Sequence, residues 1–262
     1  MKILKFTLKG KTAFFKKSDV NTYLYFTYGN IHKVALLGIF GAILGYKGYN
    51  QMKTHKPSKK SNKDEYDIFP EFYSRLKNIK VSIVSNNEKG FIPKKVQFFN
   101  NSVGYASKEQ GGNLIIKEQW LENPSWDIYV LVDNEESEKV LEYILNHKCV
   151  YEPYLGKNDH YADIEAPELL EESSIQEIIC IEKIDSLCPK RLFEIDISTD
   201  EHDDFSDDEI IENFKYEEQL PIGLDENTNM YILETLMYTN MKLINKNGTT
   251  AYKVNNKNIV FF

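Results

Sequence analysis

The chain has 262 residues, of which 42% are hydrophobic and 27% are charged. This composition is too apolar for a disordered protein, and the length allows one large domain or two small ones with a hydrophobic core. The formal net charge of −8 conceals a division: residues 1–120 hold 21 Lys and Arg against 8 Asp and Glu, whereas residues 121–262 hold 11 against 32.

The first third of the chain alternates between strand and helix patterns. Apolar residues and lysines alternate over 1–10, which predicts a strand. The basic, aromatic segment 11–30 lacks a helical period and is typical of a loop or an irregular hairpin. The apolar stretch 31–49 is helical in length and composition, and a lysine-rich loop follows it. A short helix at about 69–77 and a strand over 79–85 come next.

A hairpin is predicted in the next part of the chain. Two strand patterns, 92–99 and 113–121, are joined by a long, glycine-bearing loop. Beyond it come a strand over 126–133, a helix over 134–147 with one apolar face, and a strand over 148–156.

Without the inserted hairpin, these elements follow the order strand, helix, strand, strand, helix, strand. This order is typical of an RRM-like or ferredoxin-like unit, an antiparallel sheet with two helices on one face. We therefore predict the α+β class. An RRM/ferredoxin-like domain spans 1–158, with a β-hairpin inserted at about 86–122, and an acidic, β-rich C-terminal extension spans 159–262.

The extension is predicted from short strand patterns at 176–184 and 191–198 and from a terminal hairpin over 251–262. An acidic run extends from Asp200 to Asp208. Calcium loops need a turn-making Gly and a terminal bidentate Glu, and the run lacks such a Gly. We expect a solvated loop and no metal there; a cation site is the alternative.

The cysteines and the hydropathy pattern indicate where in the cell the protein is expected. Three cysteines form no CxxC pair, which is typical of reduced thiols in a cytoplasmic protein. The first ten residues lack the apolar core of a signal peptide. The uninterrupted apolar run from Val34 to Leu44 has 11 residues, against about 20 needed to cross a bilayer. We expect a cytoplasmic protein without membrane contact.

Motifs of common enzyme classes are absent from the sequence, including GxSxG, HExxH and GxxxxGK[ST]. Two of the five histidines are candidates for acid–base work: His32 in the basic segment, and His160 beside Lys157 and Asp159. The sequence assigns no further catalytic group to either histidine, so we expect both histidines to have surface or hydrogen-bonding roles. The sequence predicts no catalytic residue and no cofactor.

The basic segment favours nucleic acid as a partner. Lysines supply phosphate contacts, and aromatic faces stack unpaired bases at about 1–3 kcal/mol each. The candidate RNA-binding residues here are Lys11, Phe15, Lys16, Lys17, Tyr23, Tyr25, Tyr28, His32 and Lys33. The RNP signature of true RRM proteins is absent. Core aromatics flanked by solvent-facing lysines are the alternative interpretation of the same pattern.

Glycines distinguish the apolar stretch. Gly38, Gly41 and Gly45 fall on one side of a helix and leave a bare stripe. Each glycine costs about 1 kcal/mol inside a helix, so the stripe predicts close packing, most simply against the sheet. Direct approach of RNA to this face is the alternative.

Taken in order, these segments resemble a known family. Gly10, Ala13, Phe15 and Lys16, followed by the "GIFGAILG" helix of residues 38–45, resemble the N-terminal signature of the CRISPR-associated Cas-five family. Further segments match in order, among them "VQFFNNS", "EPYLGKNDHYADI" and "EEQLPIGLDEN", and are similar to its type I-B branch within the RAMP superfamily. One departure is "FTYGNIHK", where the family has a Pro-rich approach, so positive charge there has to come from His32 and Lys33.

The resemblance implies a non-catalytic subunit of the type I effector complex, Cascade. Such a subunit has an RRM-like palm and a hairpin thumb, caps the 5′ handle of the CRISPR RNA, and joins the backbone subunit to the large subunit. Target DNA is contacted at most indirectly. We then expect Lys94, Lys95 and Lys108 on the thumb to touch RNA or the backbone subunit.

Two alternatives remain from the sequence. One is a metal-independent endoribonuclease that processes CRISPR repeat RNA with His32 or His160 as acid or base. The other is a protein scaffold whose acidic C-terminal half docks a basic neighbour.

Overall fold

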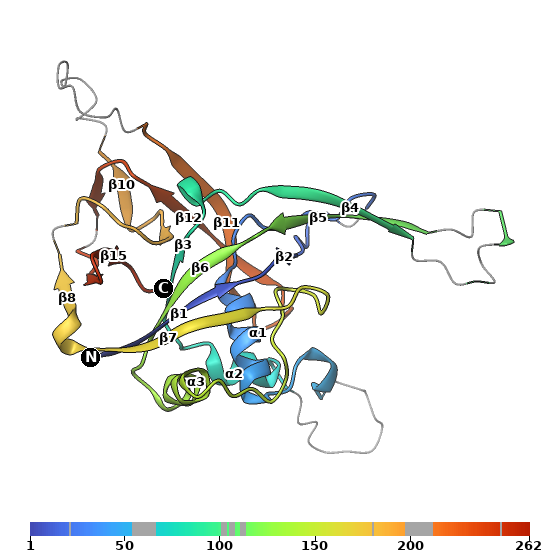
Figure 1. Ribbon diagram of the computed structural model, residues 1–262, viewed down its shortest axis with the longest axis horizontal. Helices are drawn as coiled ribbons and strands as arrows, with labels where there is room; N and C mark the ends of the chain where they lie inside the picture. Colours follow the sequence, from blue (N-terminus) through green and yellow to red (C-terminus); the bar gives the residue numbers. More distant parts are fainter. Residues whose placement is uncertain are drawn as a thin grey trace.

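A four-stranded antiparallel sheet forms the centre of the computed structural model (Figure 1). From one edge to the other its strands are β3 (Val81–Ser85), β6 (Ser125–Leu131), β1 (Lys2–Lys9) and β7 (Asp163–Glu171). Each neighbouring pair is antiparallel. The structure describes residues 1–20, 22–53, 67–100, 104, 108–110, 114–179, 181–196, 212–246 and 248–262.

Helices cover one face of this sheet. In the described part of the chain they are α1 (Lys33–Leu44), α2 (Glu71–Leu76) and α3 (Glu135–Leu145). Phe6 on β1 packs edge-to-face against Phe40 on α1, with ring centroids 6.3 Å apart. The other face of the sheet buries Ile3 and Tyr129 against the C-terminal strands. Alternating side chains of β1 therefore enter two different cores.

Along the chain the order is β1, α1, α2, β3, β6, α3, β7. The strands predicted over 1–10, 79–85 and 126–133 and the helices predicted over 31–49 and 134–147 are confirmed, with shorter bounds. Short 3-10 turns occupy Tyr49–Gln51, Glu88–Gly90 and Glu172–Ser174. No helix among the described residues is both long and apolar enough to cross a membrane.

The predicted hairpin between β3 and β6 is confirmed and projects away from the central sheet (Figure 1). Its strands β4 (Lys94–Asn100) and β5 (Ile115–Glu122) pair from Lys94 opposite Leu121 to Asn100 opposite Ile115. The two-residue strand β2 (Thr12–Ala13) pairs with the end of β5 nearest the sheet. We call β4 and β5 the thumb, and the end at β2 its base.

Small antiparallel sheets make up the C-terminal part. They contain β11 (Lys215–Leu224), β12 (Tyr231–Thr239) and β9 (Cys188–Pro189); β10 (Phe193–Ile195) and β13 (Leu243–Asn245); and β8 (Ile175–Ile178), β14 (Ala251–Val254) and β15 (Lys257–Ile259). The β14–β15 pair confirms the predicted terminal hairpin. Cys180 and the acidic run Asp200–Asp208 lie outside the described residues.

The strand predicted over 148–156 is wrong. This segment has no strand and instead lies against the end of α1, where Val150 N donates to Ile43 O (2.9 Å) and Tyr151 N to Ala42 O (3.1 Å). These bonds satisfy carbonyls that the end of a helix leaves unpaired. The edge of the sheet is formed by β7 instead, beyond the predicted domain boundary at 158.

The glycine stripe of α1 does not pack against the sheet as predicted. A Cβ atom on Gly41 would lie 2.5 Å from Phe72 Cβ on α2, whereas one on Gly38 would meet nothing within 4 Å. Gly45 ends the helix with a φ of 78°, in the left-handed region. The three glycines therefore serve three purposes: an open face, a helix–helix contact and a C-cap.

Candidate nucleic-acid interface

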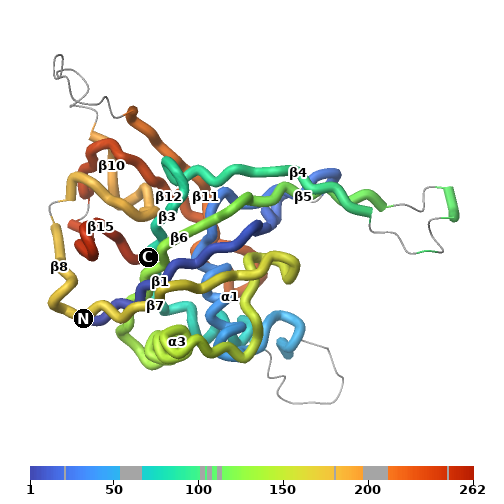
Figure 2. The backbone as a smooth tube through the Cα atoms, viewed as in Figure 1, coloured from blue at the N-terminus to red at the C-terminus, as the bar shows by residue number. Residues whose placement is uncertain are grey.

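The basic, aromatic segment between β2 and α1 is an irregular hairpin that lies against the base of the thumb (Figure 2). Its arms are joined by a hydrogen bond from Lys17 N to Phe26 O (2.8 Å). Tyr25 connects it to β5, because Tyr25 N donates to Lys117 O and its carbonyl accepts from Gln119 N, both at 2.9 Å. The basic segment and the thumb, distant in sequence, therefore form one surface.

The aromatic side chains of this hairpin divide between core and surface. Phe15 and Tyr28 are 3% and 2% exposed, and burial raises the pKa of Tyr28 to about 12. Tyr23 is 94% exposed, and half-buried Tyr25 lies under Lys16 Nζ, 4.3 Å from its ring centroid. Of the four aromatics predicted to stack on bases, only Tyr23 and Tyr25 have accessible rings.

His32 is a buried helix cap and does not supply the positive charge that the sequence predicted. Its Nδ1 accepts a hydrogen bond from Ala35 N (3.1 Å), and its ring is 3% exposed among the edges of Phe15, Tyr28 and Tyr231. Burial lowers its pKa to about 3, so the ring is neutral at physiological pH. The buried, neutral ring is therefore poorly suited to a phosphate contact that needs a charged His32.

The lysines of the segment have different surroundings. Lys11 and Lys16 are exposed. Lys17 forms an ion pair with a glutamate of β11. Lys33 donates to the main-chain oxygen of Phe262 (3.0 Å), and burial lowers its pKa to about 8. Lys11 and Lys16 are thus more exposed than Lys17 and Lys33.

Glu218 of β11 gathers several donors beside the base of the thumb. Its carboxylate accepts from Gly29 N (2.7 Å), from the Tyr216 hydroxyl (2.6 Å) and from Lys17 Nζ (2.7 Å). Burial raises the pKa of Tyr216, and burial lowers that of the neighbouring Lys94. The acidic C-terminal half thus neutralises part of the basic N-terminal half inside one molecule.

The remaining predicted lysines lie on the thumb. Lys95 pairs with Glu122 across the hairpin at 3.4 Å, and Lys108 is exposed near the tip. Lys117, which the sequence did not single out, lies 5.2 Å from the ring centroid of Phe98. Phe98 itself is 56% exposed. The thumb therefore carries charge and accessible aromatic surface side by side.

His160 is also buried, at the base of the thumb. Its Nδ1 lies 2.6 Å from Thr12 Oγ1, and Trp120 packs edge-on with ring centroids 4.5 Å apart. Burial lowers the pKa of His160. Lys157 meets Glu118, not His160, at 3.2 Å. In the described part of the chain, no group of three or more His, Cys, Asp or Glu side chains is arranged to hold a metal ion.

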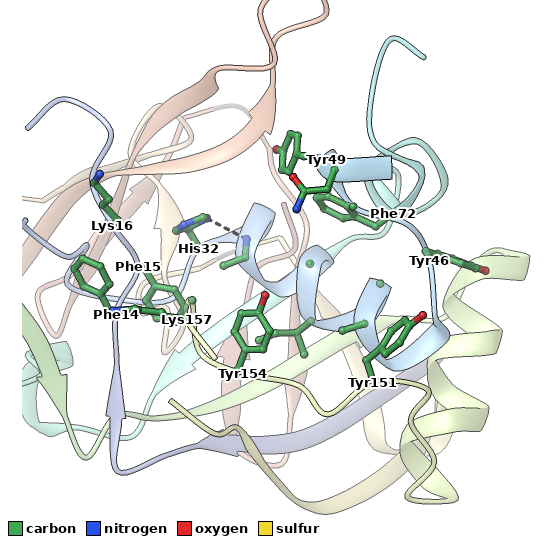
Figure 3. A pocket seen from close by; sticks show the side chains of 18 of the residues that line it. Phe14, Phe15, Lys16, His32, Tyr46, Tyr49, Phe72, Tyr151, Tyr154 and Lys157 are labelled. Carbon is green, nitrogen blue, oxygen red and sulfur yellow. Dashed lines mark hydrogen bonds between the residues drawn. The ribbon is translucent and has the colours of Figure 1, made fainter. Parts of the chain in front are cut away.

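A cleft of about 730 Å³ runs along the open face of α1 (Figure 3). Its lining combines the helix, the segment after it and the loop 148–157, and includes His32, Gly38, Tyr49, Tyr151, Tyr154 and Lys157. These tyrosines were not predicted as site residues, because 148–156 was assigned to a strand. The aromatic residues that flank the glycine helix in the sequence were the one feature that could have indicated this cleft.

Comparison with solved structures relates the fold to CRISPR-associated proteins. A chain described as "CRISPR RNA-guided surveillance complex" matches with a TM-score of 0.50 and 12% identity, over 93% of this chain and 91% of that one. A CRISPR protein from Archaeoglobus fulgidus matches with a TM-score of 0.50 and 10% identity, over 100% and 98%. No family model matches the sequence, and no curated protein matches it either. At such identities the likeness establishes a shared fold.

Proposed function

We propose that this chain is a non-catalytic, CRISPR RNA-binding subunit of a type I-B Cascade effector complex and a member of the Cas-five family. In that role it caps the 5′ handle of the CRISPR RNA and links the backbone subunit to the large subunit. The sequence resemblance suggests this role, and the fold shared with two CRISPR-associated structures supports it.

The strand order supports an RRM/ferredoxin-like palm. The sheet order β7-β1-β6-β3, with α1 between β1 and β3 and α3 between β6 and β7, is that of a βαββαβ unit. The thumb lies between the second and third strands of this unit, which is its position in the family that the sequence resembles.

Lysines set over aromatic rings carry the RNA-binding proposal. On the thumb and at its base the pairs are Lys16 over Tyr25 (4.3 Å) and Lys117 over Phe98 (5.2 Å). Lys157 lies over Phe99 (4.9 Å) but is also ion-paired with Glu118, so its charge is partly neutralised. Single-stranded RNA presents a phosphate and an unpaired base in every nucleotide. A surface that alternates ammonium groups with aromatic faces is suited to both.

The surroundings of both candidate histidines support a non-catalytic role. A general acid or base needs a pKa near the working pH and access to the substrate. The pKa of His32 is about 3, and His160 is 1% exposed with a lowered pKa. We expect CRISPR repeat RNA to stay intact when incubated with the purified protein in EDTA. A specific cut that His160→Ala abolishes would instead favour the ribonuclease.

Binding of a labelled single-stranded RNA at several salt concentrations tests the interface. Lys16→Glu removes one phosphate contact, so we expect weaker binding and a salt slope that is shallower by about 0.7. Lys253→Glu is the matched control, because Lys253 is exposed on β14. β14 pairs with β8 and β15, which lie on the side of the molecule opposite the thumb (Figure 1). Equal affinity and equal slope for Lys16→Glu and wild type would contradict the proposal.

A further inference from the structure

Strand β12 has an outer edge that is paired over only part of its length. β11 lies along one side of β12 (Figure 1), whereas β9 on the other side pairs only with Leu236 and Met237. Among the described residues, no strand pairs with the outer edge from Tyr231 to Glu234. A row of backbone groups is therefore left open at this edge.

One hydrogen bond identifies which backbone groups are open. Thr235 O accepts from the main chain next to β9 (3.0 Å), so the backbone of Thr235 faces the outer edge. The N–H and C=O groups of successive residues alternate between the two sides of a strand, so those of Leu233 and Tyr231 face the same edge. In agreement, Leu224 lies opposite Tyr231 on β11, but Leu224 N donates to the Tyr73 hydroxyl (2.8 Å) and not to β12. Two donors and two acceptors are thus available to a further strand.

The side chains along this edge are apolar and exposed. The exposed fractions of Met230, Tyr231, Ile232 and Leu233 are 65%, 37%, 45% and 44%. Ile68, which is 50% exposed, lies beside the turn before β12, because Asn229 Nδ2 donates to its main-chain oxygen (2.9 Å). Continuous exposed apolar surface of this kind marks an interaction site.

The outer edge of the central sheet has the opposite features. β7 carries Pro167 and several glutamates, and Ala166 has a φ of 46° where the pairing with β1 shifts register. Proline, charge and a bulge all keep an exposed edge from pairing with another chain. β12 has neither proline nor charge from Tyr231 to Leu233. The chain therefore protects one edge and leaves the other able to pair.

Charge in the turn before β12 favours a basic partner. Asp225 and Glu226 lie in this turn. Hydrogen bonds from Thr228 and from Asn227 N lower the pKa of Asp225, so its carboxylate is charged at physiological pH. An added strand therefore gains most from Lys or Arg at its end beside the turn.

We propose that the edge of β12 at Tyr231–Leu233 binds an extended segment of a protein partner, which joins the sheet as a further strand. The segment pairs its backbone with Tyr231 and Leu233, carries apolar side chains along this stretch, and has Lys or Arg beside Asp225 and Glu226. Its source is a protein subunit of the effector complex. The inference rests on the proposed function and adds to it the place and chemistry of one subunit contact.

Hydrogen exchange of the free chain and of the purified complex tests the edge. In the complex, a peptic fragment covering residues 230–235 should exchange about tenfold more slowly, because the outward N–H groups become bonded.

A proline variant tests the same edge by affinity. Leu233→Pro removes an outward N–H that β11 does not use and blocks the added strand. We expect its affinity for the remaining subunits to fall about 5- to 150-fold, the range of one unmade hydrogen bond. Leu233→Val, which keeps the N–H, is the matched control and should bind within about twofold of wild type.

Ile232→Lys provides a second variant should Leu233→Pro not fold, because a lysine opposes pairing at an open edge. Its control is Ile244→Lys on β13, since Ile244 is 49% exposed but already lies between Lys242 and Lys246. Only Ile232→Lys should weaken assembly.

Each outcome bears on the inference. If the complex forms with CRISPR RNA but the fragment exchanges as in the free chain, or if Leu233→Pro and Ile232→Lys bind like wild type, the edge assignment is overturned while the proposed function stands. If the chain joins no complex, both fail. If the free chain is a dimer that Ile232→Lys dissociates, the edge pairs with a second copy, and the assignment to another subunit is overturned.

Discussion

Lys17 Nζ lies 2.7 Å from Glu218 Oε1, which joins the basic N-terminal segment to the acidic C-terminal hairpin β11–β12. Glu218 is 13% exposed, so this pair is shielded from solvent more than a surface ion pair. The opposite charges of the two halves of the chain thus meet within the molecule. The pair also removes Lys17 from the charge that is available to an RNA phosphate.

Glu218→Gln should lower the free energy of unfolding by about 1–3 kcal/mol, because the carboxylate holds three donors at a poorly exposed position. Urea unfolding measures this. Glu168→Gln is the control: Glu168 pairs with Lys5 at the same 2.7 Å but is 43% exposed, so we expect about 0–1 kcal/mol. Glu218→Gln should also strengthen RNA binding at low salt, since it releases Lys17 from its ion pair. Similar losses of stability for the two variants would count against the role given to Glu218.

Alanine at Gly38 and at Gly41 should change stability in opposite directions. Gly38→Ala adds a side chain in open space and should stabilise by up to about 1 kcal/mol through helix propensity. Gly41→Ala forces a Cβ against Phe72 and should destabilise by about 1–3 kcal/mol through overpacking. Thermal unfolding of both variants distinguishes the two positions. A shift of the same sign and size for both would refute the α1–α2 contact.

His32 should make the protein less stable in mild acid. Its pKa is about 3 in the folded protein against an ordinary value of 6.5, so between these values the unfolded chain binds a proton that the folded protein does not. Stability is therefore lost as the pH falls below 6.5, by about 2 kcal/mol at pH 5 from this one group.

Urea unfolding at pH 7 and pH 5 measures the effect. His32→Asn preserves the helix cap and should remove that loss. His147→Asn makes the same change at an exposed histidine and serves as the matched control. A pH dependence that His32→Asn does not alter would show that the ring is not buried in the neutral form.

Local patterns located the elements whose periodicity was strong. The thumb strands, α3 and the glycine helix appear where alternation or helical spacing predicted them. The strand predicted at 148–156 failed because a short apolar and aromatic run such as Cys149–Tyr151 also suits a loop that caps a helix. The long β11–β12 hairpin was not recognised, since Pro221 interrupts its pattern; the register shift beside Pro221 accommodates that residue.

The candidate site was harder to predict because its chemistry depends on burial and on distant partners. Nothing near His32 in the sequence indicates that Phe15, Tyr28 and Tyr231 enclose its ring. Nor does the basic segment reveal that Glu218, about two hundred residues away, neutralises Lys17. The lysine and tyrosine composition indicated a nucleic-acid surface, but which side chains reach solvent is decided by tertiary packing.

Copurification followed by sequencing of bound RNA tests the central proposal most directly. The tagged chain should be expressed with the other subunits of its effector complex and with a CRISPR array. We predict an assembly in which this chain crosslinks to the repeat-derived 5′ end of the CRISPR RNA, and in which Lys16→Glu weakens that crosslink. Recovery of the chain without CRISPR RNA, or crosslinks confined to other regions of the RNA, would contradict the proposal.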